Sequence, residues 1–125
     1  MFGKKEKTNI NKVDTLIGKD STFRGDLRAS GTVRIEGYFQ GEINSQGDVI
    51  ITESGKVEAA IKARNIFIAG FLQGDVEAIG KVDMSATGQL YGNIKVAGIS
   101  LEEGALFNGN CQMGKQNKLE KLKAK

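Results

Sequence analysis

Apolar and polar residues follow a repeating pattern between Ile17 and Lys115, with a period of 16 to 17 residues. From the second repeat on, each unit opens with an alternating apolar pair and continues with an apolar-x-small-polar-apolar segment, from which the third unit departs with Val57-x-Ala59-Ala60-Ile61. The six units begin at Ile17, Val33, Val49, Ile66, Val82 and Ile99. A fixed period of this length is typical of solenoid proteins, in which one unit cannot bury its apolar face without its neighbours.

The alternation predicts short strands with one buried face. Val and Ile favour strands, and the frequent Gly residues disfavour helices. We therefore predict an all-β, single-domain parallel β-helix of about six coils over residues 17–115, between a basic N-terminal tail (1–16) and a Lys-rich C-terminal tail (116–125). An ordinary β-sandwich is the alternative, and the recurrence of residue types at matching positions argues against it.

The alignment of the units predicts four apolar ladders, which we name A to D. Ladder A contains Val33, Val49, Ile66, Val82 and Ile99. Ladder B contains Ile35, Ile51, Ile68, Met84 and Leu101. Ladder C contains Phe23, Phe39, Val57, Leu72, Leu90 and Phe107. Ladder D contains Leu27, Ile43, Ile61, Val76, Ile94 and Cys111. Coils spaced by about 4.8 Å would form a rod roughly 29 Å long.

The two ends of such a rod expose unpaired strand edges and one layer of every ladder unless polar caps cover them. We expect end-to-end association through these layers, with Phe107 at the centre of the C-terminal joint. If each end pairs with its own kind, the resulting filament has no polarity. The C-terminal layer is predicted to contain Leu101, Leu106, Phe107, Cys111 and Met113. The N-terminal layer is predicted to contain Leu16, Ile17, Phe23 and Leu27.

Composition excludes much of enzyme chemistry. The chain has no His, which removes the commonest general base and metal ligand, and no segment reads as a phosphate-binding loop. We therefore expect no catalytic residue, metal or cofactor. Asp26 and Glu42 share an outward ladder, and a solvated face explains them better than an acid–base pair. The single cysteine, Cys111, falls on ladder D and favours a reducing, cytoplasmic setting.

Charge is distributed unevenly along the chain. The net charge is +3, to which residues 1–16 contribute +2, residues 17–114 contribute −3 and residues 115–125 contribute +4. A mildly acidic rod argues against nucleic acid lying along it, because such binding needs a basic stripe. The sequence contains no run of 18 apolar residues, so it predicts no transmembrane helix.

The N-terminus combines large apolar side chains with lysines. Met1 and Phe2 precede Lys4, Lys5 and Lys7. Phe2 could enter the acyl boundary of a membrane while the lysines lie over anionic headgroups. The alternative is a solvated tail, since one such anchor gives only marginal binding. Assembly of many chains would add the anchors by avidity.

The coil at Val33–Ile43, the Met-Phe-x-Lys-Lys start and the absence of His together resemble bactofilins, which are bacterial cytoskeletal proteins, over about residues 1–115. The resemblance implies a right-handed β-helix and nucleotide-free assembly into non-polar filaments, joined head to head and tail to tail. It implies attachment to the inner face of the cell membrane through Met1, Phe2, Lys4 and Lys5. Many members carry longer, Pro-rich termini, whereas this chain contains no Pro.

Two function classes therefore compete. The first is a self-assembling, membrane-associated cytoskeletal scaffold that organises cell shape or localises partner proteins, with cell-wall or cell-shape proteins as further partners. The second is a non-polymerising β-helical rod that binds a protein or a glycan.

Overall fold

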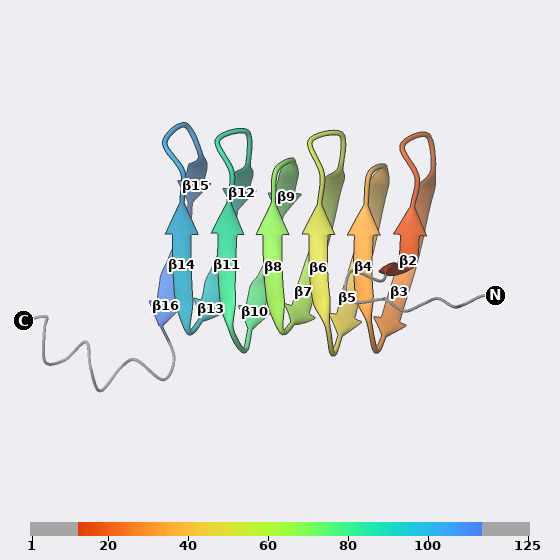
Figure 1. Ribbon diagram of the computed structural model, residues 1–125, viewed down its shortest axis with the longest axis horizontal. Helices are drawn as coiled ribbons and strands as arrows, with labels where there is room; N and C mark the ends of the chain where they lie inside the picture. Colours follow the sequence, from red (N-terminus) through yellow and green to blue (C-terminus); the bar gives the residue numbers. More distant parts are fainter. Residues whose placement is uncertain (1–12, 114–125) are drawn as a thin grey trace, which may run out of the picture.

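A computed structural model describes residues 13–113, and every regular element in it is a strand. The strands form six coils of a parallel β-helix that stack along one axis (Figure 1). One strand of each coil belongs to a six-stranded sheet, the front sheet, which faces the viewer in Figure 1. Its strands are β2 (Val13–Ile17), β4 (Thr32–Ile35), β6 (Asp48–Ile51), β8 (Asn65–Ile68), β11 (Lys81–Met84) and β14 (Gly98–Leu101). The predicted all-β solenoid is confirmed.

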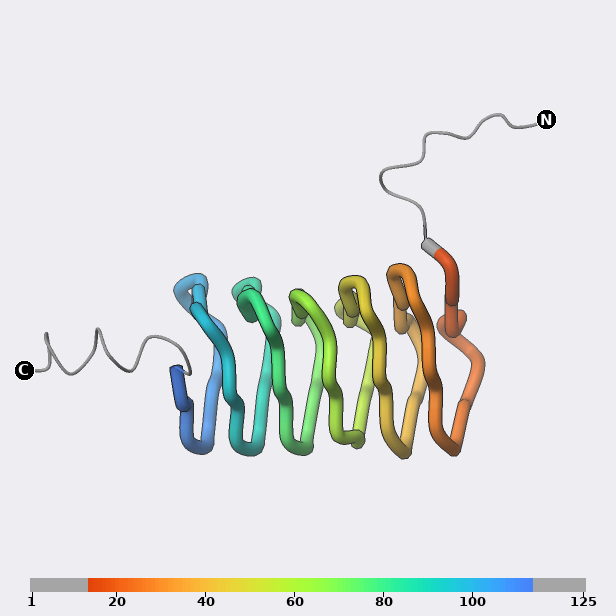
Figure 2. The backbone as a smooth tube through the Cα atoms, turned by 90° about the horizontal axis from the view of Figure 1, so that it is seen from below, coloured from red at the N-terminus to blue at the C-terminus, as the bar shows by residue number. Residues whose placement is uncertain are grey.

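The remaining strands form a second sheet, the back sheet, behind the first. The first three coils contribute one eight-residue strand each: β3 (Thr22–Ala29), β5 (Tyr38–Ser45) and β7 (Lys56–Ala63). The last three contribute two short strands each: β9 (Phe71–Gln73), β10 (Val76–Ala78), β12 (Gln89–Tyr91), β13 (Ile94–Val96), β15 (Leu106–Asn108) and β16 (Cys111–Met113). The tube in Figure 2 shows the coils in regular succession, with the first and last at opposite ends of the rod.

The strand register confirms all four predicted ladders. In ladder A, Val33 pairs with Val49, and the series continues to Ile99. In ladder C, Phe23 pairs with Phe39, and the series continues to Phe107. Ladders B and D follow in the same way. The members from the second to the fifth coil are buried between the two sheets, so the core is one continuous apolar column.

The first coil differs from the prediction. Ile17 pairs with Ile35 and so belongs to ladder B, whereas Thr15 pairs with Val33 and takes the first place in ladder A. The strand β2 begins at Val13, four residues before the predicted start of the β-helix. The register also shifts between Val13 and Thr15. The predicted tail 1–16 therefore overlaps the first coil. The sequence pattern missed this start because Thr15 stands where the later units have Val or Ile.

A fifth ladder, ladder E, lies where the chain leaves the back sheet for the front sheet. Small side chains fill it in the first four coils, and Ser45 is its one polar member. The Ser45 hydroxyl donates to the carbonyl of Gly31 at 2.7 Å and accepts from the amide of Gly47 at 2.9 Å, so the buried oxygen is satisfied. Ladder E contains Ala29, Ser45, Ala63, Ala78, Val96 and Met113.

Glycines of the back sheet stack where the chain bends with positive φ. These are Gly25, Gly41, Gly74, Gly92 and Gly109, with φ between 138° and 151°. A Cβ atom on Gly92 would overlap the carbonyl oxygen of Gly74 in the coil before it. Ala59 takes the equivalent place in the third coil without a positive φ. The glycines therefore permit a close backbone approach that a side chain would block.

Gly92→Ala should lower the free energy of unfolding by at least about 1–3 kcal/mol, because alanine is strained at this φ and its Cβ would overlap Gly74. The matched control is Gly98→Ala, whose added Cβ would meet only the Cβ of Lys81, at 3.8 Å. That change should stay within about 0.5 kcal/mol of the parent chain. Urea unfolding followed by circular dichroism measures both, and equal stability of the two variants would contradict the backbone-packing argument.

Candidate functional site

The C-terminal coil leaves one apolar layer without a covering coil among the described residues. Leu101 is 47% exposed, whereas its ladder neighbour Met84, one coil earlier, is 1% exposed. Phe107 is half-buried and pairs with Leu90, which is fully buried. The loss of burial comes from position alone, since the ladders place chemically similar side chains in both coils. This layer is a ready apolar surface at the end of the rod.

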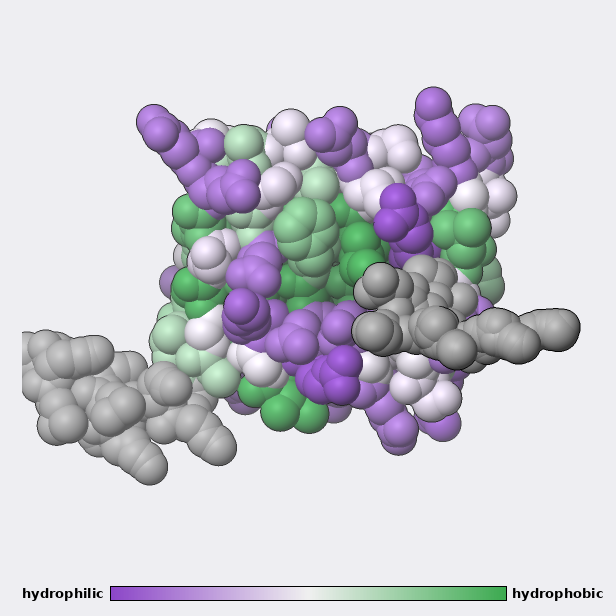
Figure 3. All heavy atoms as spheres, viewed as in Figure 1, coloured by the Kyte–Doolittle hydropathy of each residue, from purple (hydrophilic) through white to green (hydrophobic). Residues whose placement is uncertain are grey.

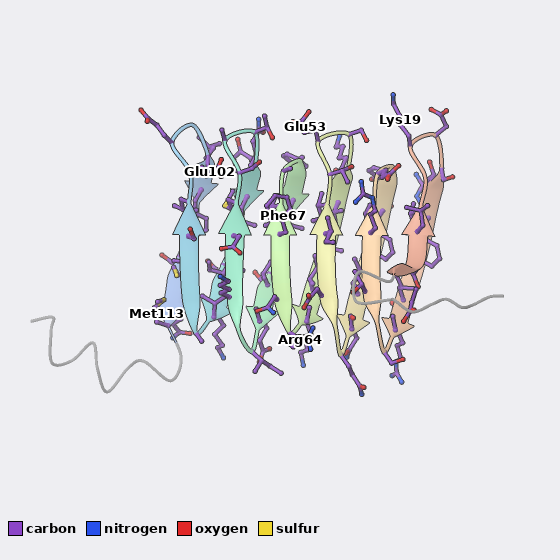
Figure 4. The ribbon with its side chains drawn as sticks, viewed as in Figure 1. Lys19, Glu53, Arg64, Phe67, Glu102 and Met113 are labelled. Carbon is purple, nitrogen blue, oxygen red and sulfur yellow. The ribbon has the colours of Figure 1, made fainter. Side chains whose placement is uncertain are left out.

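Two sulfur-containing side chains complete the C-terminal layer. Cys111 ends ladder D beside Ile94, and Met113 ends ladder E beside Val96. The Cys111 Sγ lies 4.0 Å from the Met113 Sδ. Figure 4 labels Met113 at this end of the rod. Partial burial raises the pKa of the Cys111 thiol. The thiol is therefore largely protonated at neutral pH, and Cys111 is exposed at the end of ladder D.

Leu106 does not belong to the C-terminal layer, contrary to the prediction. It precedes the inward-facing Phe107, and successive residues of a strand point to opposite faces. Its ladder neighbour is Gln89, which is exposed, and the next is Phe71. Leu106 therefore lies on the outside of the back sheet, where the Lys56 ammonium lies 5.7 Å from the ring centre of Phe71.

The N-terminal end brings together three of the four predicted residues. Phe23 stacks on Phe39 with ring centres 4.9 Å apart and an interplanar angle of 8°. Leu27 is half-buried against ladder D, and Ile17 is buried at the head of ladder B. Leu16, the fourth, points outward on the front sheet beside Arg34 and is 58% exposed. Leu16 therefore does not point into the end layer with the other three, and its predicted place at the polymer interface stays a prediction.

Three end-layer residues were not predicted. Thr15 and Ala29 lie at the N-terminal ends of ladders A and E, and Ile99 lies at the C-terminal end of ladder A. Ala29 and its ladder could have been found by extending the two-residue alternation past ladder D, as in Leu27-x-Ala29. The predicted membrane-targeting residues Met1, Phe2, Lys4, Lys5 and Lys7 lie outside the described residues.

Part of the back sheet carries polar ladders on its outside. An open groove of about 460 Å³ follows the back sheet, lined by outward side chains that include Glu42, Lys62, Asp75 and Lys95. Opposite charges alternate along it, as expected of a solvated face. Within residues 13–113, no group of three or more His, Cys, Asp and Glu side chains is placed to hold a metal ion, and no helix is long and apolar enough to cross a membrane.

Comparison with known proteins decides the family. Residues 15–112 match the family named bactofilin, described as polymer-forming cytoskeletal. This chain belongs to the bactofilin family. Bactofilins are structural proteins of the cytoskeleton that polymerise into filaments, so the expected resemblance is confirmed and the chain belongs to a polymer-forming class.

Alignments with individual bactofilins span most of the chain. Bactofilin BacN of Myxococcus xanthus (strain DK1622) is 51% identical over 98 residues, which span 78% of this chain and 87% of BacN. Bactofilin BacO of the same organism is 29% identical over 108 residues, 86% of each chain. The cryo-EM structure of Thermus thermophilus bactofilin double helical filaments aligns with a TM-score of 0.66 and 32% identity, covering 78% of this chain and 96% of that one.

The raised pKa of Cys111 predicts the pH dependence of its alkylation. Only the thiolate reacts, and a raised pKa means that a higher pH is needed to form it. The rate of iodoacetamide labelling of unassembled chains should therefore rise with a midpoint above about 8.5, the value of a free cysteine. Mass spectrometry over a pH series measures the rate, with N-acetylcysteine as reference. A midpoint below that of the reference would contradict the placement of Cys111 against the end of ladder D.

Proposed function

We propose that this bactofilin forms filaments end to end, through the apolar layers of its first and last coils. The observation that carries the proposal is the abrupt exposure of the core ladders at the last coil, where Leu101 and Phe107 lack the cover that Met84 and Leu90 have. Covering such a layer with a second copy removes apolar surface from water and pairs the free strand edges.

In the proposed filament, the C-terminal coil of one rod contacts the C-terminal coil of the next, and the N-terminal coil contacts an N-terminal coil. The C-terminal joint contains Phe107 of two chains, and the N-terminal joint contains Phe23 of two chains. Such isologous joints obey two-fold symmetry and give a filament without polarity, as the family resemblance implies. We expect assembly to need no nucleotide. We also expect two such filaments to associate side by side, because the filaments of the Thermus relative are double helical.

The filament is proposed to lie on the inner face of the cell membrane, in the cytoplasm. The segment Met1–Lys7 supports this, since Phe2 offers an apolar anchor and Lys4, Lys5 and Lys7 offer positive charge to anionic lipids. A filament presents this segment once per chain, so weak anchors act together. In that position it would serve as a scaffold that organises cell shape or localises cell-wall or cell-shape proteins.

The joints predict distinct products for two matched variants. Phe107→Arg places a charge in the C-terminal joint and should abolish filaments but leave dimers held by the N-terminal joint. Phe23→Arg, at the other end of the same ladder, should leave dimers held by the C-terminal joint. The double variant should lack both end-to-end joints and form no chain of rods. Sedimentation velocity and negative-stain microscopy measure these states, and circular dichroism checks the fold.

Leu106→Arg is the control for Phe107→Arg, because it adds the same charge one residue away on the outside of the rod. It should form filaments like the parent chain. Filaments from Phe107→Arg would contradict the C-terminal joint, and so would equal loss of filaments in both variants. Monomers from either single variant would instead indicate a polar, head-to-tail filament.

Reversal of the N-terminal charges should release filaments from anionic membranes. The triple variant Lys4→Glu, Lys5→Glu and Lys7→Glu should bind phosphatidylserine vesicles more than about 100-fold more weakly, because each lost lysine removes about 1 kcal/mol at such a surface and each introduced carboxylate is repelled by it. The control reverses the same number of charges at the other end, with Lys118→Glu, Lys121→Glu and Lys123→Glu. Cosedimentation with vesicles measures binding, and equal losses in the two variants would contradict a specific N-terminal anchor.

A further inference from the structure

The outer surface of the front sheet carries an exposed apolar centre. One outward ladder runs through all six strands, and its two central members are Ile50 and Phe67. Phe67 is 41% exposed. Figure 3 shows apolar side chains gathered in the middle of this face with polar ones on either side, and Figure 4 places Phe67 at its centre. We name this the front ladder; it contains Leu16, Arg34, Ile50, Phe67, Asp83 and Ser100.

Opposite charges flank the apolar centre, each one coil away from it. Arg34 pairs with Ile50 on the N-terminal side, and Asp83 pairs with Phe67 on the C-terminal side. Each of these two side chains lies near an oppositely charged side chain two residues away in the same chain. The Arg34 Nε donates to Glu36 at 2.7 Å, and the Lys81 Nζ lies 3.7 Å from Asp83. Both Arg34 and Asp83 remain partly exposed, so each can receive a further partner from outside.

This order of charges is complementary to itself when two rods lie face to face in opposite directions. A two-fold axis between the faces, directed along the strands, places Arg34 opposite Asp83 of a second copy and Ile50 opposite its Phe67. Each contact then occurs twice, as in any isologous interface. Two parallel rods would instead place Arg34 opposite Arg34 and Asp83 opposite Asp83. The ladder therefore favours the antiparallel pair.

The neighbouring outward rows are compatible with the antiparallel pair. Extended by one residue at each end, the strand register places Glu36 opposite Ser85 of the second copy and Lys81 opposite its Thr32. These positions bring no like charges together. Stacked sheets pack about 10 Å apart, a separation that side chains such as Ile50 and Phe67 can fill.

We propose that the front ladder pairs two filaments of this chain side by side, with antiparallel rods in contact. The inference rests on the end-to-end filament proposed above. In a filament with head-to-head and tail-to-tail joints, successive rods point in opposite directions. Where the two-fold axes of the joints lie along the normal of the front sheet, successive front sheets face the same side. A neighbouring filament of the same kind then presents an antiparallel rod to every rod, and the same contact repeats along the whole length.

Charge reversal tests the pairing and its direction. Arg34→Asp should convert paired filaments into single ones, because the carboxylate introduced at position 34 then faces Asp83 of the second copy. Asp83→Arg should do the same. The double variant Arg34→Asp and Asp83→Arg restores opposite charges across the antiparallel interface and should restore pairs. Electron microscopy measures the width and the crossovers of the filaments. Paired filaments in both single variants would overturn the proposal, and so would single filaments in the double variant.

A second pair of variants tests the apolar centre. Phe67→Ser should yield single filaments, because it removes the largest apolar side chain of the face. Ile79→Ser is the control, since Ile79 is 82% exposed but lies in the turn between β10 and β11, away from the front ladder. Pairs should persist in that variant. Equal effects of the two changes would overturn the assignment of the face.

The outcomes separate this proposal from the end-to-end filament. Single filaments in the variants, with pairs in the parent chain, support both. If the parent chain forms filaments but never pairs them, the end-to-end joints are supported and the lateral pairing through the front ladder is overturned. If the parent chain forms no filaments, the end-to-end proposal fails. The face is then tested by sedimentation, where a dimer that Arg34→Asp dissociates supports it and a monomer overturns it.

Discussion

The stacking of each inward side chain on its equivalent in the next coil is the interaction on which this rod depends. One coil has too few residues to enclose a core, so a residue such as Leu72 is buried only because Val57 and Leu90 lie on either side of it. The same rule fails at the last coil, where Phe107 has a neighbour on one side only. The surface proposed for assembly is therefore a direct consequence of how the fold is stabilised.

Close stacking also constrains the backbone. Glycines with positive φ recur at one bend of the back sheet, and an added Cβ would meet the carbonyl oxygen of the preceding coil. Ala59 breaks the series, and the chain there follows a continuous strand, β7, without positive φ. The proposed assembly surfaces are thus the two ends of the core itself. The inward ladders set the shape of the rod, their end layers are proposed to join rods, and the outward front ladder is proposed to pair filaments.

The sequence predicted the interior well, because inward positions repeat with strict chemistry. Ladders A to D occur in the predicted register from the second coil onward. The start of the first coil was predicted four residues too late, because Thr15 is not apolar like the other members of ladder A. Leu16 and Leu106 are apolar residues of the two terminal coils, but alternation along a strand turns both outward. The front ladder was not predicted, because its complementarity depends on which outward residues the coils align, a property of six units together.

Cryo-EM of filaments formed by the full chain without nucleotide tests the central claim most directly. Six coils spaced by about 4.8 Å, joined alternately at like ends, predict strand spacing that continues through the joints and an axial repeat of two rods, roughly 58 Å. Phe107 and Phe23 should then lie at alternate joints. Filaments in which the rods touch only by their sides, with both end layers facing solvent, would contradict the account.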